Sequence, residues 1–354
     1  MPRIVIAGAG ATGVSIAYHL ALRDASEVIL CDRGEIGSGA TGKAFGGIRQ
    51  QFSTAAEVQL AKESIRFFEQ LGPRLFQQVG YLFLATTEPG LAGLVDRAEV
   101  QASLGVPVER VSSDRAAQLA PGTAVDDVIG GVFGPSDGVC DPPAVLRHVL
   151  ARAIELGVQV LTHTDVTDVP RDVLVVACGP WSAEVMARQG AELPVQPLCR
   201  QLFETEPLAQ LSRRLPLVLE EETGLHFRRV GDRLRVAMRD PAPRFGFAEE
   251  VDESVVSDRL RRLRHRFPAA ARLRVSRAWT GLYDMTPDAH PIIDRIRDDL
   301  VVACGFSGHG FMQSPAVGQA VAELVLDGSA SFDLAPYRLA RFAEGATVSE
   351  HVVL

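Results

Sequence analysis

Three glycines near the start of the chain have the spacing of a phosphate-binding turn. Gly8, Gly10 and Gly13 form the pattern GxGxxG directly after an apolar run, residues 3–7. In such a turn the first glycine permits a tight bend, the second lets a pyrophosphate approach the backbone, and the third lets a helix pack on the strand. Asp32 follows about 20 residues later, where a carboxylate accepts hydrogen bonds from a ribose. These residues predict a dinucleotide site at a helix N-terminus, which favours phosphates.

Two further stretches consist of small residues that let backbone approach a cofactor. Residues 37–43 form a second loop directly after the ribose acid, where an NAD-binding domain would return to helix and strand. Residues 305–312 form a glycine-rich turn between an apolar run and an amphipathic one. The opening pattern alone does not separate NAD from FAD, but the second loop favours FAD.

The elements that must position these residues alternate along the chain. The opening is predicted to be strand, turn, helix, strand, because Val14, Ala17, Tyr18 and Ala21 recur at helical spacing. Apolar runs at 158–161, 174–177 and 300–304 predict further buried, parallel-type strands. A helix is expected from Pro142 to about residue 156, after Asp141 as N-cap.

The middle of the chain has a different pattern. Residues 200–284 alternate apolar and polar side chains, which is typical of an antiparallel sheet with one covered face. We therefore predict an α/β fold with a discontinuous, Rossmann-like FAD-binding domain and an inserted, mainly antiparallel β-sheet substrate domain. The first would comprise residues 1–77, 140–196 and 285–354, and the second residues 78–139 and 197–284.

Composition excludes some function classes. The formal net charge of -8 argues against nucleic acid as the main partner. No apolar run reaches the roughly 18 residues that span a bilayer, and the first strand begins too early to leave room for a signal peptide, so we expect a cytoplasmic protein. The five cysteines are scattered without metal-ligand spacing, so no metal is expected.

A cluster of arginines between residues 259 and 266 is the local exception to the acidic balance. Arg259, Arg261, Arg262, Arg264 and Arg266 are expected to form the solvated face of a helix. An anion-binding or partner-binding patch is the alternative.

The stretches above, together with residues 46–52, 177–182 and 280–288, resemble the D-amino-acid oxidase superfamily. The likeness is to the branch of sarcosine oxidase, glycine oxidase and the flavin subunits of dye-linked proline dehydrogenases. These segments run in family order from residue 3 to beyond residue 320. The resemblance covers nearly the whole chain, and it is specific for the superfamily rather than for a substrate.

The resemblance implies FAD in an extended form. Its adenosine end would meet the opening turn and Asp32, the second loop would follow the pyrophosphate, and the last glycine turn would meet the pyrimidine edge of the flavin. The implied cofactor-binding residues are Gly8, Gly10, Ala11, Thr12, Gly13, Asp32, Arg33, Ser38, Thr41, Lys43, Gly46, Gly47, Ile48, Val166, Gly179, Trp181, Gly308, His309, Gly310, Phe311 and Met312.

Departures from the family narrow these implications. Covalent-flavin sarcosine oxidases attach FAD through a cysteine that aligns with Gly281, so the FAD is expected to be non-covalent. Their substrate-binding lysine aligns with Met312, and their oxygen-activating lysine aligns with Arg235. Arg235 could still supply a positive charge near the flavin, so oxygen and an electron-accepting partner both remain as oxidants.

The substrate side needs a group that anchors a carboxylate, and arginine suits this task because its planar fork binds both oxygens. Arg49, which follows a glycine pair, matches a family arginine that binds the substrate carboxylate, with a structural salt bridge as the alternative. Arg277 and Arg239 are further candidates, and Tyr283 could line the pocket. His309 is expected to position backbone and hydrogen-bond at the flavin, with proton transfer as the alternative.

The expected function is oxidation of the C–N bond of a small amine or amino acid, secondary or N-methylated by preference. Hydride would pass to flavin N5, and the imine product would hydrolyse. The alternative is a flavin-bearing subunit or assembly factor of a hetero-oligomer with little amine turnover of its own. An NAD(P)-dependent dehydrogenase is disfavoured by the second loop and the last glycine turn.

Overall fold

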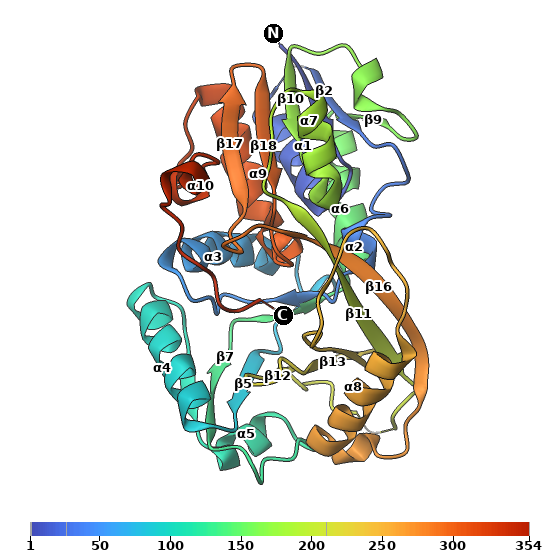
Figure 1. The fold of residues 1–354 in the computed structure, drawn as a ribbon, viewed down its shortest axis with the longest axis vertical. Coiled ribbons are helices and arrows are strands. Elements are labelled where there is room, and N and C mark those ends of the chain that lie inside the picture. Colours follow the sequence, from blue (N-terminus) through green and yellow to red (C-terminus); the bar gives the residue numbers. More distant parts are fainter. Residues whose placement is uncertain (1, 26, 210, 354) are drawn as a thin grey trace.

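The computed structural model describes residues 2–25, 27–209 and 211–353. The chain folds into two bodies stacked along the long axis of the molecule, each built around its own β-sheet (Figure 1). Two long strands, β11 (Gln196–Thr205) and β16 (Val275–Met285), run from one body into the other as an antiparallel pair (Figure 1).

The first body contains, among the described residues, a six-stranded sheet in the order β17-β18-β10-β1-β2-β9. Its strands are parallel apart from the edge strand β17, which is antiparallel to β18. The bounds are β1 (Arg3–Ala7), β2 (Glu27–Cys31), β9 (Gln159–Leu161), β10 (Val173–Val176), β17 (Ile292–Arg297) and β18 (Leu300–Cys304). The central strands are nearly continuous apolar runs because both faces of a parallel sheet are covered.

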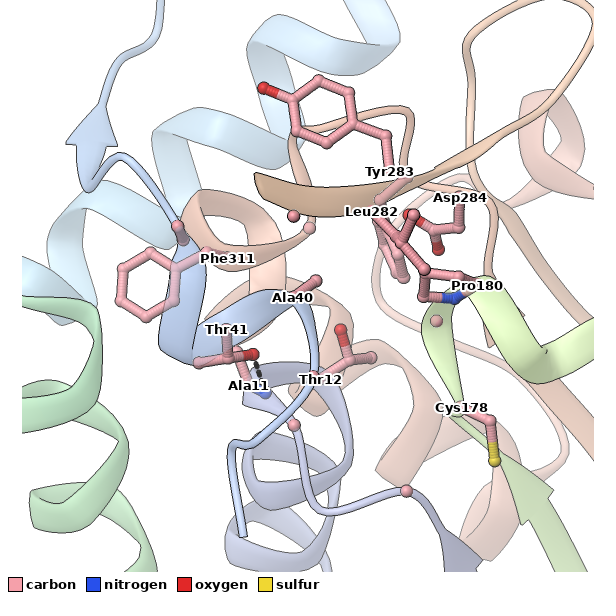
Figure 2. Close-up of a pocket in the computed structure, with 18 of the residues that line it drawn as sticks. Ala11, Thr12, Ala40, Thr41, Cys178, Pro180, Leu282, Tyr283, Asp284 and Phe311 are labelled. Atoms are coloured by element: carbon pink, nitrogen blue, oxygen red, sulfur yellow. Dashed lines mark hydrogen bonds between the residues drawn. The ribbon is translucent and has the colours of Figure 1, made fainter. Parts of the chain in front are cut away.

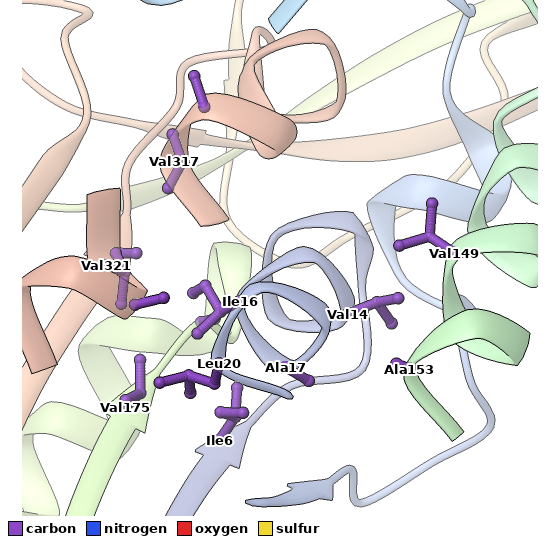
Figure 3. Packing of buried hydrophobic residues seen from close by; sticks show 14 of the residues in the cluster. Ile6, Val14, Ile16, Ala17, Leu20, Val149, Ala153, Val175, Val317 and Val321 are labelled. Carbon is purple, nitrogen blue, oxygen red and sulfur yellow. The ribbon is translucent and has the colours of Figure 1, made fainter. Parts of the chain in front are cut away.

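Helices cover both faces of this sheet. On one face α1 (Ala11–Leu22) lies between α6 (Pro142–Glu155) and α9 (Gly310–Asp327), and Figure 3 shows Ile16 and Leu20 of α1 among side chains of the neighbouring elements. The helix α3 (Ala55–Gln70) contributes to the same core. On the opposite face α7 (Ser182–Arg188) packs over a second core. Burial of these apolar faces fixes the N-terminus of α1 at the carboxyl end of β1.

The second body contains, among the described residues, a nine-stranded sheet in the order β15-β11-β14-β13-β12-β5-β7-β6, with β16 paired to β11. All pairs are antiparallel except β12 with β5. The other bounds are β5 (Tyr81–Ala85), β6 (Glu109–Val111), β7 (Gly130–Gly134), β12 (Leu217–Glu220), β13 (His226–Val230), β14 (Arg233–Ala237) and β15 (Arg244–Phe245). The helices of this body are α4 (Glu88–Ser103), α5 (Ser113–Leu119) and α8 (Glu253–Arg266).

The predicted fold class is confirmed: an α/β body with a Rossmann-like sheet is interrupted by a mainly antiparallel body. The exact domain boundaries stay a prediction. Three of them, 139/140, 196/197 and 284/285, fall inside the strands β8 (Gly138–Cys140), β11 and β16, which belong to the junction between the bodies. There β8 pairs with β3 (Gly47–Ile48) and β4 (Phe76–Gln77), and α2 (Ala40–Lys43) lies beside β16.

The arginines of α8 are not uniformly solvated, so the expectation of a solvated arginine face was wrong for two of them. Arg259 and Arg266 are fully buried, because Arg259 pairs with Asp240 and Arg266 pairs with Glu220 and Asp127. Buried guanidinium groups require such partners. These two arginines are therefore not available to dock a partner.

The last described residues return to the centre of the molecule. After α10 (Arg341–Glu344) the chain runs back to the junction, where Figure 1 marks its end between the two bodies. Glu350 and Val352 are buried there, and the Glu350 carboxylate accepts hydrogen bonds from the Ser53 and Val352 backbone N–H groups. We call residues 350–353 the C-terminal tail.

Two further findings concern the whole of the described chain. Within these residues, none of the helices combines the length and the apolarity needed to cross a bilayer. They also hold no group of three or more His, Cys, Asp or Glu side chains placed to bind a metal ion.

Candidate active site

One large cavity runs between the two bodies, with an empty volume of about 2550 Å³ that includes open solvent. It begins at the carboxyl ends of β1, β2 and β10 and continues along α2 to β16 and the N-terminus of α9. Figure 2 shows side chains from these separate elements converging on it, with Thr41 of α2 beside Ala11 at the start of α1 and Cys178 just after β10. The carboxyl edge of the parallel sheet is where such folds bind nucleotides.

The glycine turn has the conformation that its sequence predicts. Gly8 has φ +103, which favours glycine, and a Cβ at Gly13 would overlap the Gly8 carbonyl oxygen. Gly10 is the N-cap of α1 and has no side chain of its own to cap the first turn, where the Ala11 N–H donates to Thr41 Oγ1. Because the first N–H groups of a helix lack intrahelical partners, the other N–H groups of this turn can bind phosphate oxygens.

The Asp32 carboxylate is held by backbone N–H groups beside the glycine turn. Its Oδ2 accepts from the Ala9 N–H at 2.7 Å and its Oδ1 accepts from the Gly34 N–H at 2.8 Å. A carboxylate has further lone pairs, so both oxygens can still accept from hydroxyl groups in the cavity. This arrangement fits the predicted ribose contact.

The second loop is tied to α1 and to the sheet of the second body. Thr41 Oγ1 accepts from the Ala11 N–H at 3.0 Å, as Figure 2 shows. The Lys43 ammonium forms an ion pair with Glu249, and its carbonyl accepts from Trp279 Nε1 at 3.1 Å. Gly281 lies against the Lys43 side chain, where a Cβ would stand 3.2 Å from Lys43 Cβ. Lys43 therefore lies between the cavity and β16.

An aromatic stack borders the cavity at the turn after β10. The Trp181 ring stacks on Phe247 with 5.8 Å between centroids, and the Arg33 guanidinium lies 5.2 Å from the Trp181 centroid. Trp181 also packs against Gly39 of the second loop. The stack joins three segments that are far apart in the sequence.

The N-terminus of α9 closes the opposite end. His309 is its N-cap, without a side-chain cap hydrogen bond, and the Asp284 carboxylate accepts from the Gly305 N–H at 2.7 Å. Burial raises the pKa of Asp284 to about 6. Gly308 lies against the Tyr283 ring, so the glycine turn and the end of β16 form one wall.

Arg49 reaches this wall but is fully engaged with the protein. Its side chain is 1% exposed, Nη2 donates to the Val352 carbonyl at 2.7 Å, and Nη1 donates to the Gln51 carbonyl. Its guanidinium lies 4.0 Å from the Phe52 centroid. Burial lowers the pKa of Arg49 from its ordinary value. Its partners are carbonyl groups, and within the described part of the chain Arg49 forms no salt bridge, which was the alternative to carboxylate binding.

His309 shares the same carbonyl. Its Nε2 donates to the Val352 carbonyl at 3.0 Å, and burial together with the Arg49 charge lowers the pKa of His309 well below its ordinary value. The ring is therefore neutral at pH 7. Among the described residues, its Nδ1 has no hydrogen-bond partner.

Most of the predicted site residues line the cavity. Those that do so are Gly8, Gly10, Ala11, Thr12, Asp32, Arg33, Ser38, Thr41, Lys43, Gly46, Gly47, Arg49, Val166, Gly179, Trp181, Tyr283, Gly308, His309, Gly310, Phe311 and Met312. Gly13 and Ile48 lie behind the wall, in α1 and β3.

Arg277 and Arg239 do not line the cavity. Arg277 is largely exposed and pairs with Glu204, and Arg239 donates to the Glu221 carbonyl at 2.5 Å. Arg235, the candidate positive charge for oxygen activation, also pairs with Glu204, at 2.8 Å.

Tyr81, Arg200, Gln201 and Asp284 are among the cavity residues that the sequence did not indicate as site residues. Arg200 had a visible signal, because it interrupts an apolar run of the strand β11. Tyr81 and Asp284 belong to predicted strand or family segments, but their direction toward the cavity depends on how the two bodies meet.

The fold and the cavity define a two-body protein of the dinucleotide-binding class, with residues of the second sheet lining the same cavity as the glycine turn. Residues 3–324 match the family model described as FAD dependent oxidoreductase, and the chain belongs to this family. The protein is thus an FAD-dependent oxidoreductase.

Individual relatives agree with the family. The chain is 28% identical to glycine oxidase of Geobacillus kaustophilus, over 96% of this chain and 96% of the relative. It is 26% identical to sarcosine oxidase subunit beta of Arthrobacter sp., over 98% and 93%. It is also similar to the crystal structure of L-proline dehydrogenase from P. horikoshii, with a TM-score of 0.91, 28% identity and coverage of 97% and 98%.

The residues present fit FAD. The N-termini of α1 and α9, whose N-cap residues Gly10 and His309 make no side-chain cap hydrogen bond, meet the cavity at opposite ends. A diphosphate and the electron-rich edge of a flavin would each find N–H groups there. The small residues of the second loop between them leave room for a long cofactor.

Proposed function

We propose that this FAD-dependent oxidoreductase oxidises the C–N bond of a small amine or amino acid, with a preference for secondary or N-methylated ones. The observation that carries the proposal is the end of the cavity at α9, where Tyr283, a neutral His309 and arginine side chains meet beside a helix N-terminus. The printed names of the relatives, which are oxidases or dehydrogenases of glycine, sarcosine and proline, support the same substrate class.

Bound FAD would accept the hydride from the carbon next to nitrogen, giving an imine that hydrolyses. The residues of the protein would stabilise charge and position the groups around the reacting atoms. The N-terminus of α9 would stabilise negative charge, and the neutral His309 would add no positive charge that repels a protonated amine. Asp284 holds the turn at Gly305 and thereby the start of α9.

We also propose that FAD is bound non-covalently, because Gly281 has no side chain to attach it. Oxygen or an electron-accepting partner would take up the electrons. The similarity to a sarcosine oxidase subunit supports a hetero-oligomer as the native form. The cytoplasmic location expected from the sequence stays a prediction.

The test is anaerobic mixing of the purified yellow protein with a panel of amines that includes sarcosine, proline, glycine and D-amino acids. At least one of them is expected to bleach the visible flavin absorbance. Reoxidation by oxygen is then compared with reoxidation by a dye. If every amine leaves the flavin oxidised, the C–N oxidation proposal is wrong, and a flavin-bearing subunit without amine turnover becomes the better account.

A further inference from the structure

Two arginines border the cavity wall near Tyr283, and they differ in how much of their hydrogen-bonding capacity is free. Arg49 comes from the junction strand region after β3, and Arg200 comes from β11 of the second body. The phenol of Tyr283 lies within reach of both charges: burial raises the pKa of Tyr283, while Arg200 and Arg49 act to lower it. The guanidinium with the freer N–H groups is the better candidate to bind a substrate carboxylate.

A bidentate carboxylate needs two neighbouring N–H groups of one guanidinium. On Arg49 both terminal nitrogens already donate, to the carbonyls of Gln51 and Val352, and among the described residues only its Nε is without a partner. The C-terminal tail holds the second of these carbonyls in place, since the Val352 side chain is buried among Tyr81, Phe83 and Leu217. On Arg200 one terminal nitrogen makes a long contact with Asp240, at 3.5 Å.

Around Arg200 the guanidinium groups outnumber the carboxylates that pair with them. Its one ion-pair partner among the described residues is Asp240, at 3.5 Å, and Asp240 also pairs with the fully buried Arg259. One carboxylate thus serves two guanidinium groups. Arg244 adds a third charge on the same side, where its terminal nitrogens donate to the Glu250 carbonyl and to Cys199 Sγ. A poorly hydrated excess of positive charge favours binding of an anion.

The position of Arg200 directs this charge at the cavity. In the register of β11 with β16, Arg200 stands opposite Gly281, next to the strand end that carries Tyr283. Its guanidinium lies 5.7 Å from the Tyr283 ring centroid. Its Nε is buried and, within the described part of the chain, has no hydrogen-bond partner.

We propose that Arg200, rather than Arg49, anchors the carboxylate of the substrate beside Tyr283, and that the substrate is therefore an amino acid and not a simple amine. The inference rests on the proposed C–N oxidation. Arg49 is then a positioning residue that ties the C-terminal tail to the turn before α9 through the carbonyl that it shares with His309.

The first test uses the holoprotein and an unreactive probe. Acetate is titrated against the oxidised protein, and the visible flavin spectrum reports its Kd, with acetamide as the uncharged control. Loss of a charge-assisted hydrogen-bonded pair predicts that Arg200→Gln weakens acetate binding about 10- to 100-fold, and Arg200→Lys should recover part of it. Acetamide should be unaffected by either change.

A second variant keeps the test decisive if Arg200→Gln folds poorly. Arg200→Lys keeps a positive charge beside Asp240 but loses the planar fork, so it should fold and bind acetate more weakly than wild type and more tightly than Arg200→Gln. The proposal is overturned if wild type shows no acetate effect, if Arg200→Gln binds acetate as wild type does, or if Arg49→Lys alone abolishes acetate binding.

The second test separates this inference from the proposed function. Sarcosine and proline are compared with their counterparts without a carboxylate, dimethylamine and pyrrolidine, by anaerobic flavin reduction. Arg200→Gln should lower the rate with the amino acids at low concentration and leave the rate with the plain amines nearly unchanged. If none of the four reduces the flavin, C–N oxidation is wrong, while the acetate titration still decides whether Arg200 is an anion site.

Discussion

Replacing Gly10 or Gly13 by alanine, one at a time, should distinguish a glycine that is needed only for FAD binding from one that is also needed for folding. Gly13 lies inside α1, where alanine would ordinarily stabilise a helix by about 1 kcal/mol. Here, however, the new Cβ would overlap the Gly8 carbonyl oxygen, which belongs to backbone and cannot rotate away. Overpacking of this kind costs about 1–3 kcal/mol, so Gly13→Ala should lower the stability of the apoprotein.

Gly10 is the matched control. Its φ of -82 suits alanine, and a Cβ there would approach Thr41 Oγ1 at 3.3 Å, a side-chain atom that can shift slightly. Gly10→Ala should therefore leave the free energy of unfolding of the apoprotein within about 0.5 kcal/mol of wild type. Because Gly10 lines the cavity where the phosphates are predicted to bind, the added methyl group should weaken FAD binding by about 10- to 100-fold through loss of charge-assisted hydrogen bonds.

The assay is a pair of measurements on each apoprotein: urea denaturation followed by circular dichroism, and FAD titration followed by quenching of flavin fluorescence. Both variants should bind FAD weakly, but only Gly13→Ala should shift the denaturation midpoint. A Gly10→Ala protein with wild-type FAD affinity, or a Gly13→Ala protein with wild-type stability, would refute this assignment of the turn.

Three further predictions concern the rest of the fold. Arg266→Gln leaves Glu220 buried without its partner and should lower the free energy of unfolding by about 3–5 kcal/mol, measured by urea denaturation. The control Arg261→Gln, on the exposed side of α8, should lower it by less than about 0.5 kcal/mol. Equal effects would contradict the burial of Arg266. Burial raises the pKa of Asp284 to about 6, so between pH 4 and pH 6 the folded state holds a proton that the unfolded state loses. The free energy of unfolding of wild type should therefore fall by up to about 3 kcal/mol as the pH rises from about 4 to above 6. Asp284→Asn should flatten this decline, and identical pH profiles of unfolding would show that Asp284 does not titrate there. Finally, denaturation of the holoprotein should release all flavin into the filtrate, and yellow colour retained on the precipitated chain would contradict non-covalent binding at a site with Gly281.

The opening turn could be predicted from the sequence because its constraints are local. Gly8, Gly10 and Gly13 are required by backbone geometry within one turn, and Asp32 ends the next strand in register with β1. The alternation of residues 200–284 likewise predicted an antiparallel sheet, since side-chain direction in a strand has a period of two.

Contacts between distant segments could not be predicted in this way. The sequence predicts that the Arg49 guanidinium binds a substrate carboxylate. In the structure it donates to the carbonyl of Val352, which lies 303 residues further along the chain. The arginines of α8 have the spacing of a solvated face, yet Arg259 and Arg266 meet carboxylates from other elements.

Arg277 shows a further reason why some site residues could not be predicted from the sequence. It belongs to the same strand as Tyr283 and shares its face by parity, but six residues of strand correspond to about 20 Å. This distance takes Arg277 out of the cavity and to Glu204. Strand parity predicts the face of a sheet but not where a cavity on that face ends.

The most direct test of C–N oxidation is the product formed in a single anaerobic turnover. The holoprotein is mixed with excess of the amino acid that bleaches it fastest, and the carbonyl product is measured against the flavin reduced. We expect one equivalent of carbonyl compound from imine hydrolysis, or of cyclic imine where the substrate is proline, for each reduced FAD. Flavin reduction without either product, or no reduction by any amino acid, would contradict C–N oxidation.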